Sequence, residues 1–218
     1  MLEEISSQEL GSAADWLIKA VEERALDLFD ELLSGAVALW TSAAFSRFND
    51  DEVCCTVRLY ACALEVAKSQ SKYALVRVTY DSVVPTPDML TGNAHPNSSV
   101  RPDLLFTIGR LELFVEAKRL AKKSPLPRKY VTDGMSRFTT GYYVQSLGYP
   151  AQMLGYVVAD DTSSIVAKIN VAIAQHLPNH SKLEFEDVSS AMTTYKTNDA
   201  ASGPMVHRLL DLHAGVAS

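Results

Sequence analysis

The segment PDLLFTIGRLELFVEAK, residues 102 to 118, decides the fold predicted for this chain. If Gly109-Arg110 is the two-residue loop of a hairpin, the numbers of paired residues sum to 219. Ile108 then lies opposite Leu111, and Asp103 lies opposite Glu116. The segment therefore predicts two antiparallel strands, near 102 to 108 and 111 to 118.

This register sorts the side chains of the hairpin onto two faces, because successive residues of a strand point to opposite sides. One face is wholly apolar and predicts core: Leu104, Phe106, Ile108, Leu111, Leu113 and Val115. The other face carries the polar side chains, together with two apolar ones: Asp103, Thr107, Glu112, Glu116, Lys118, Leu105 and Phe114.

Asp103 and Glu116 on adjacent strands are suited to share a hard divalent cation, which prefers oxygen ligands at about 2.1 Å for magnesium. Like charges opposite each other are destabilising unless something compensates them, and a cation does so. A bound cation polarises a phosphate and lowers the pKa of a water molecule. Lys118, roughly 7 Å beyond Glu116 on the same face, can hold a phosphate oxygen as a point charge. The pattern indicates a metal-dependent phosphodiesterase site. The alternative is an exposed hairpin with a Glu116–Lys118 surface ion pair worth at most about 1 kcal/mol.

Pro102-Asp103, followed thirteen positions later by Glu116-Ala117-Lys118, resembles the motif of the PD-(D/E)xK nuclease superfamily. This superfamily includes restriction endonucleases and many repair and phage-defence nucleases. Its core is a helix, three strands, a helix and a further strand. The chain can be read in that order, with elements at about 51 to 68, 73 to 80, 102 to 108, 111 to 118, 132 to 143 and 153 to 159. The resemblance implies an α/β fold with a restriction-endonuclease-like core, a mixed β-sheet flanked by helices.

The resemblance also implies the roles of individual residues. Asp103, Glu116 and Lys118 would be catalytic, and Asp103 and Glu116 would bind Mg²⁺ or Mn²⁺. Many members add an acid from the first core helix, for which Glu52 is the best candidate, ahead of Asp51 and Glu65. The implied activity is hydrolysis of DNA phosphodiester bonds in bacterial defence or restriction. Two alternatives are a non-catalytic nucleic-acid-binding or scaffold subunit of a defence or repair complex, and a junction or flap resolvase.

A basic segment follows the proposed site directly, although the net charge of the chain is −6. Six of the twelve residues from 118 to 129 are basic and none is acidic. Pro125 and Pro127 are expected to keep this segment extended. The cations of this segment would contact the polyanionic backbone of DNA. Arg137, in the helix predicted at 132 to 143, would contact a phosphate as well, assisted by Gln145 or Gln152. The predicted nucleic-acid-binding residues are Arg119, Lys122, Lys123, Arg128, Lys129 and Arg137. The alternatives are a solvated charged loop and a structural ion pair for Arg137.

Length and composition favour one compact domain: 218 residues, of which 47% are hydrophobic. We expect an N-terminal helical extension at 1 to 48 and a nuclease-like domain at 49 to 218. Apolar residues of the extension recur at helical spacing, which favours packing or dimerisation, as a homodimer or with a partner subunit. They are Leu10, Ala14, Leu17, Val21, Leu28 and Leu32.

The remaining features exclude some classes of protein. No apolar stretch reaches the roughly 20 residues needed to span a bilayer, and the first residues lack a signal-peptide pattern. We therefore expect a cytoplasmic protein with no membrane partner. Three cysteines within one predicted helix argue against disulfides and a zinc site. His207 and His213 would share one face of a strand, either beside the site or, as we favour, at a sheet edge.

Overall fold

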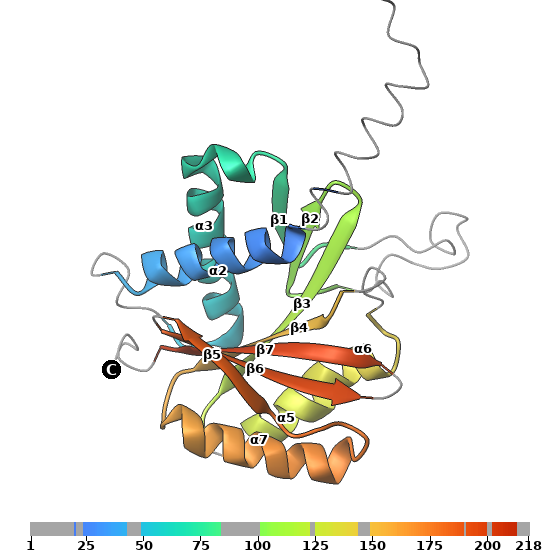
Figure 1. Ribbon diagram of the computed structural model, residues 1–218. Helices are drawn as coiled ribbons and strands as arrows, with labels where there is room; N and C mark the ends of the chain where they lie inside the picture. Colours follow the sequence, from blue (N-terminus) through green and yellow to red (C-terminus); the bar gives the residue numbers. More distant parts are fainter. Residues whose placement is uncertain are drawn as a thin grey trace, which may run out of the picture.

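The computed structural model describes residues 20, 24–42, 49–83, 101–122, 125–143, 149–189, 191–199 and 202–212. These residues form a seven-stranded mixed sheet in the order β1-β2-β3-β4-β7-β6-β5, with helices on both faces (Figure 1). Strand β3 pairs antiparallel with β2 and parallel with β4. The predicted α/β class with a mixed sheet flanked by helices is therefore confirmed.

The elements follow one another along the chain as α2 (Ala25–Trp40), α3 (Glu52–Ser69), the 3₁₀ turn η2 (Ser71–Tyr73), β1 (Val76–Tyr80), β2 (Leu104–Ile108), β3 (Leu111–Leu120), α5 (Leu126–Lys129), the π-helix η4 (Tyr130–Met135), α6 (Ser136–Thr139), β4 (Ala151–Val157), α7 (Thr162–His176), β5 (Glu184–Ser189), β6 (Met192–Asp199) and β7 (Gly203–Asp211).

The hairpin of β2 and β3 has the predicted register. Ile108 pairs with Leu111, and Leu104 pairs with Val115. Gly109 has a φ of 61°, which suits the first central position of a two-residue hairpin turn. The predicted apolar face is buried throughout: Leu104, Phe106, Ile108, Leu111, Leu113 and Val115. Alternation of side chains therefore set both the register and the core face.

The helix predicted at 132 to 143 begins earlier than expected, at Leu126, and ends at Thr139, because α5, η4 and α6 follow without a break. The prediction of an extended segment around Pro125 and Pro127 was therefore wrong for residues 126 to 129. Pro127 lies in the first turn of α5, where the missing N–H leaves no helical hydrogen bond unmade and the fixed φ suits a helix.

Two cores lie on opposite faces of the sheet. On one face, α2 and α3 cover the apolar side of the hairpin, and the ring of Phe29 meets that of Phe106 at 4.6 Å. On the other face, α5, η4, α6 and α7 pack over β3, β4 and β7. Part of the predicted N-terminal extension thus packs into the same core as the sheet. Leu28 and Leu32 belong to α2, whereas Leu10, Ala14, Leu17 and Val21 lie outside the described residues.

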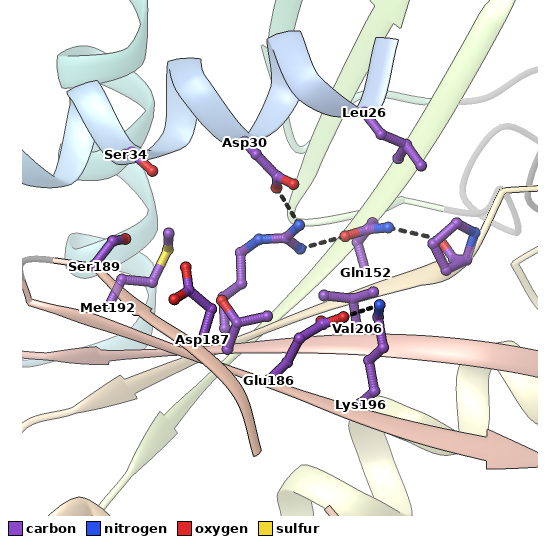
Figure 2. Close-up of a pocket in the computed structure, with 13 residues that line it drawn as sticks. Leu26, Asp30, Ser34, Gln152, Glu186, Asp187, Ser189, Met192, Lys196 and Val206 are labelled. Atoms are coloured by element: carbon purple, nitrogen blue, oxygen red, sulfur yellow. Dashed lines mark hydrogen bonds and ion pairs between the residues drawn. The ribbon is translucent and has the colours of Figure 1, made fainter. Parts of the chain in front are cut away.

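A polar cavity of about 310 Å³ lies between α2 and the far half of the sheet (Figure 2). Arg208 of β7, almost fully buried, reaches across it to the carboxylate of Asp30 on α2 and donates to Oε1 of Gln152 at 2.5 Å. Lys196 pairs with Glu186 on the neighbouring strand. The pair of Arg208 and Asp30 thus ties α2 to the sheet, and the pair of Lys196 and Glu186 joins β6 to β5. Gln152, a predicted aid to DNA binding, contacts Arg208 here.

Within the described ranges, no helix combines the length and the apolar character that a bilayer crossing requires.

His207 lies in a central strand, since β7 is flanked by β4 and β6, and the expectation of an edge position was wrong. Its ring is fully buried between the hydroxyls of Tyr130, 3.0 Å from Nδ1, and Thr197, 2.9 Å from Nε2. Burial lowers the pKa of His207 to about 3, because the imidazolium would lose its hydration. His213 lies outside the described residues.

We expect the neutral His207 to make the fold acid-labile. Below its ordinary pKa of about 6.5 the unfolded chain binds one proton more than the folded chain, so the free energy of unfolding falls by about 1.4 kcal/mol per pH unit from this group until about pH 3. Urea unfolding of the wild type and of His207→Gln at pH 7.5, 6 and 5 measures this. The variant should lose less stability on acidification, whereas His176→Gln, at the exposed end of α7, should follow the wild type. Parallel curves for wild type and His207→Gln would contradict the assignment.

Candidate functional site

The site forms where β3 extends past the end of its neighbour. Strand β2 pairs with β3 only as far as Val115, whereas β3 continues to Leu120 beside β4. Carboxylates take the place of a strand partner along this edge. Asp103 accepts the N–H of Ala117 at 2.7 Å, and Glu52, at the first turn of α3, accepts the N–H of Arg119 at 2.9 Å. Acids from two distant segments are thereby held beside β3.

The ammonium of Lys118 lies at the centre of the site. Its Nζ is 2.6 Å from Oε1 of Glu116, 3.1 Å from Oε1 of Glu52 and 3.8 Å from Oδ2 of Asp103. It also donates to the carbonyl of Ala117 at 2.9 Å. The three residues of the predicted motif and the predicted upstream acid therefore meet around one cation.

The two alternative upstream acids have other partners. Asp51 is the N-cap of α3, and its side chain accepts the N–H groups of Val53 and Cys54. Glu65 pairs with Lys68 on the exposed surface of the same helix. Capping by Asp51 fixes where α3 begins, and this start points Glu52 at β3.

Glu116 is the most deeply buried acid of the group, with an exposed fraction of 0%. Its Oε2 accepts from Arg137 at 2.7 Å and lies 2.8 Å from the hydroxyl of Tyr143. Arg137 also donates to that hydroxyl at 2.7 Å. Oε1 contacts Lys118 in an ion pair but has no partner at hydrogen-bond geometry within the described residues. In the described part of the chain, one oxygen of the buried carboxylate is thus fully bonded, and the other faces the ammonium alone.

The charges of the site shift the pKa values of its members. Burial and the negative charge of Glu116 raise the pKa of Asp103 to about 6, against the attraction of Lys118. Burial disfavours the charged forms of Lys118 and Arg137, but the groups around them, with Glu116 the strongest, together outweigh it, so that the pKa of both is raised. Burial and Glu116 also raise the pKa of the Tyr143 phenol. Three carboxylates, counting Glu52, thus face two permanent cations, so the group carries a formal charge of −1 at pH 7.

The donor set fits a hard divalent cation such as Mg²⁺ or Mn²⁺ in chemical type. Asp103, Glu116 and Glu52 offer carboxylate oxygens, the carbonyl of Ala117 offers another oxygen, and among the described residues Oε1 of Glu116 contacts no donor other than Lys118. Magnesium and manganese prefer such oxygen ligands. As the side chains stand in the described part of the chain, no three His, Cys, Asp or Glu groups converge closely enough to hold a metal ion. The oxygens surround the Lys118 ammonium instead.

The predicted nucleic-acid-binding residues lie at two places. Arg137 contacts the site from α6, and Arg119 pairs with Asp50 beside it. Lys122, Arg128 and Lys129 are exposed beyond the end of β3 and on α5. Lys123 lies outside the described residues, as does Gln145.

Sequence reasoning missed Tyr143, which the structure brings back against Arg137 and Glu116. The signal was Gly141, two residues after the end of α6, with a φ of 73°. Glycine at such a position reverses the chain after a helix, so that the N–H of Tyr143 donates to the carbonyl of Arg137 at 2.9 Å. The ring of Tyr143 then stacks on Phe114 at 5.7 Å.

Comparisons of this chain with models of known protein families, with curated proteins and with solved structures gave no match.

Proposed function

We propose that this protein is a divalent-metal-dependent nuclease of the PD-(D/E)xK type, with a restriction-endonuclease-like core, that hydrolyses DNA phosphodiester bonds in bacterial defence or restriction. One observation carries the proposal: Glu52, Asp103, Glu116 and Lys118, which come from three separate segments, meet within contact distance. A surface ion pair needs neither the burial of Glu116 nor the convergence of three acids.

The raised pKa of Asp103 supports the same proposal. Burial and a second carboxylate disfavour the charged form of Asp103. Carboxylates whose charged form is disfavoured in this way are typical of functional sites, where a bound cation compensates the negative charge.

Asp103, Glu116 and Glu52 would hold the metal, which when bound polarises the scissile phosphate and lowers the pKa of a water molecule. The residues of the chain have their own tasks. Lys118 offers a permanent positive charge for a phosphate oxygen or the attacking water. Arg137 and Tyr143 hold Glu116 by its Oε2 and leave Oε1 facing the site. Glu52 and Asp103 accept hydrogen bonds from backbone N–H groups at the edge of β3, and these bonds fix the positions of the two carboxylates.

The second candidate is a non-catalytic nucleic-acid-binding or scaffold subunit. A specific observation favours it: Asp103 and Glu52 already satisfy edge N–H groups of β3, and Lys118 offsets part of the negative charge of the acids around it. In this case the site would serve stability alone, and the protein would bind nucleic acid or a partner without cutting.

Cleavage by the purified wild type separates the two candidates. We expect supercoiled plasmid and linear duplex DNA to be cut in millimolar Mg²⁺ or Mn²⁺ and to stay intact with EDTA, because two adjacent carboxylates need a cation to approach a phosphate. RNA of matched length serves as the substrate control. Intact DNA in either metal, together with metal-independent DNA binding, would favour the scaffold.

A further inference from the structure

An open hollow of about 420 Å³ lies between the end of β3, α5 and α7, outside the site described above. Three cations from three segments line it: Lys122 after β3, Arg128 of α5 and Lys168 of α7. Its floor is apolar and is built by Pro127, Val171 and Ala172. Among the described residues that line this hollow there is no acid, in contrast to the polar cavity under α2.

The three cations are held near one another by the fold. Lys168 donates from Nζ to the carbonyl of Lys122 at 3.0 Å, and the N–H of Lys122 donates to Asp160 just before α7, at 2.6 Å. The bond between Lys168 and Lys122 joins residues 46 positions apart in the sequence. Arg128 lies on α5, which packs against α7 (Figure 1). The positive charge of the hollow is therefore a product of tertiary structure, and Lys168 does not belong to the basic segment of the sequence.

The hollow is close to the candidate site along two paths. Lys122 follows Lys118 by four residues, at most about 14 Å of extended chain. Arg128 and Arg137 belong to one continuous helical segment, nine residues apart, or roughly 14 Å at helical rise. Such a span corresponds to about four phosphates of one DNA strand along the duplex axis.

We infer that this hollow is a nucleic-acid subsite: it binds the phosphates and sugars of the DNA strand that leads away from the cleavage site, through Lys122, Arg128 and Lys168. This inference rests on the proposed function, because that function supplies the polyanion. It adds α7 to the interface, with Lys168 as a contact outside the basic segment.

The chemistry of the hollow favours a sugar-phosphate backbone over other anions. The cations stand around an apolar floor in which Val171 is 57% exposed, and a nucleic-acid strand presents the C–H groups of its sugars between its phosphates. Backbone contacts of this kind position a protein without reading bases. We therefore expect binding here to be independent of sequence.

The test measures binding of a fluorescent duplex oligonucleotide by the full chain, at several salt concentrations and in Ca²⁺ to suppress cleavage. Each phosphate contact removed should flatten the slope of log K against log salt by about 0.9 for duplex DNA. Lys168→Ala should thus flatten it by about 0.9 and raise Kd roughly three- to tenfold. The triple variant Lys122→Ala/Arg128→Ala/Lys168→Ala should flatten it by about 2.7. Val171→Glu, which places an acid on the exposed floor, should also weaken binding.

Lys182→Ala is the matched control, because it removes an exposed lysine just beyond α7 that does not line the hollow. It should bind as the wild type does. An unchanged slope for the triple variant would overturn the inference. Binding of poly-glutamate is measured in parallel: if Lys168→Ala loses it while DNA binding stays intact, the hollow is a protein-docking site and the inference is also overturned. Binding is read without cleavage, so a wild type that binds through Lys168 but does not cut supports the subsite and removes only the nuclease proposal. A wild type that does not bind DNA overturns both.

Discussion

Asp103→Asn, Glu116→Gln and Lys118→Ala are each expected to lower the rate of DNA cleavage by about 10³-fold or more. The two amides keep the shape of the acids but remove the negative charge that a divalent cation requires. Lys118→Ala removes the ammonium that contacts all three acids. Losses of about 10²- to 10³-fold follow the removal of a single group that stabilises charge in a transition state, and loss of the metal removes more.

Initial rates of plasmid cleavage on purified variants measure this effect, with circular dichroism to establish that each variant folds. Glu112→Gln is the matched control for Glu116→Gln, because Glu112 is on the same strand and face, four residues before the site, and pairs with Thr107. Removing a partner from a buried ion pair can also cost stability. Lys118→Arg therefore accompanies Lys118→Ala, since it keeps the charge and alters only its geometry. Cleavage at the wild-type rate by any of the three would remove that residue from the proposed chemistry.

Asp103→Asn is expected to have opposite effects on stability with and without metal. Above its pKa of about 6 the folded chain holds Asp103 as a buried carboxylate beside Glu116, at a cost that the unfolded chain, with an ordinary pKa near 3.9, does not bear. Between about pH 4 and 6 the folded state binds more protons, so this group's contribution to stability rises as the pH falls. At pH 7.5 in EDTA the neutral amide should raise the melting temperature by about 2–4 °C, which corresponds to about 1 kcal/mol in a chain of this size.

Millimolar Mn²⁺ or Mg²⁺ should reverse this order. A ligand that binds only the folded state adds about 2.7 kcal/mol at one hundred times its Kd, and Asp103→Asn should lose this gain because it lacks one of the ligands. Melting curves of both proteins at pH 7.5, in EDTA and in each metal, give the four values needed, and calorimetric titration gives the affinity. If neither metal changes the melting temperature of the wild type and the titration gives no heat, the result favours the scaffold over the nuclease.

A stabilising substitution at the centre of a site distinguishes a functional carboxylate from a structural one. If Asp103 served only to satisfy the N–H of Ala117, Asn could still accept that bond through its side-chain oxygen, and nothing would be gained by removing the charge. A rise in melting temperature would show that the charge itself is costly, and such a cost is kept where function requires it.

The sequence by itself determined the hairpin. Gly109 suits the turn, and the period-two alternation of apolar side chains allows one register only, since a slip of one residue would turn Leu104 and Phe106 to the wrong face. Once Ile108 pairs with Leu111, Asp103 must come beside Glu116 and Lys118 must follow on the same side. The local cap at Asp51 likewise determined where α3 begins and therefore that Glu52 lies in its first turn. These features depend on neighbours in the chain, and local rules describe them well.

Only the tertiary structure decided what surrounds that motif. How far β3 extends past β2, and which carboxylates satisfy its free edge, depends on α3 packing against the sheet. The binding of Glu116 by Arg137 and Tyr143 depends on a helix that begins at Leu126 and on the reversal at Gly141. His207 lies at the centre of the sheet because β7 inserts between β4 and β6. Lys168 joins Lys122 only because α7 packs on α5. Each of these contacts joins distant segments, and its position is set by how whole elements pack, which no local pattern of residues records.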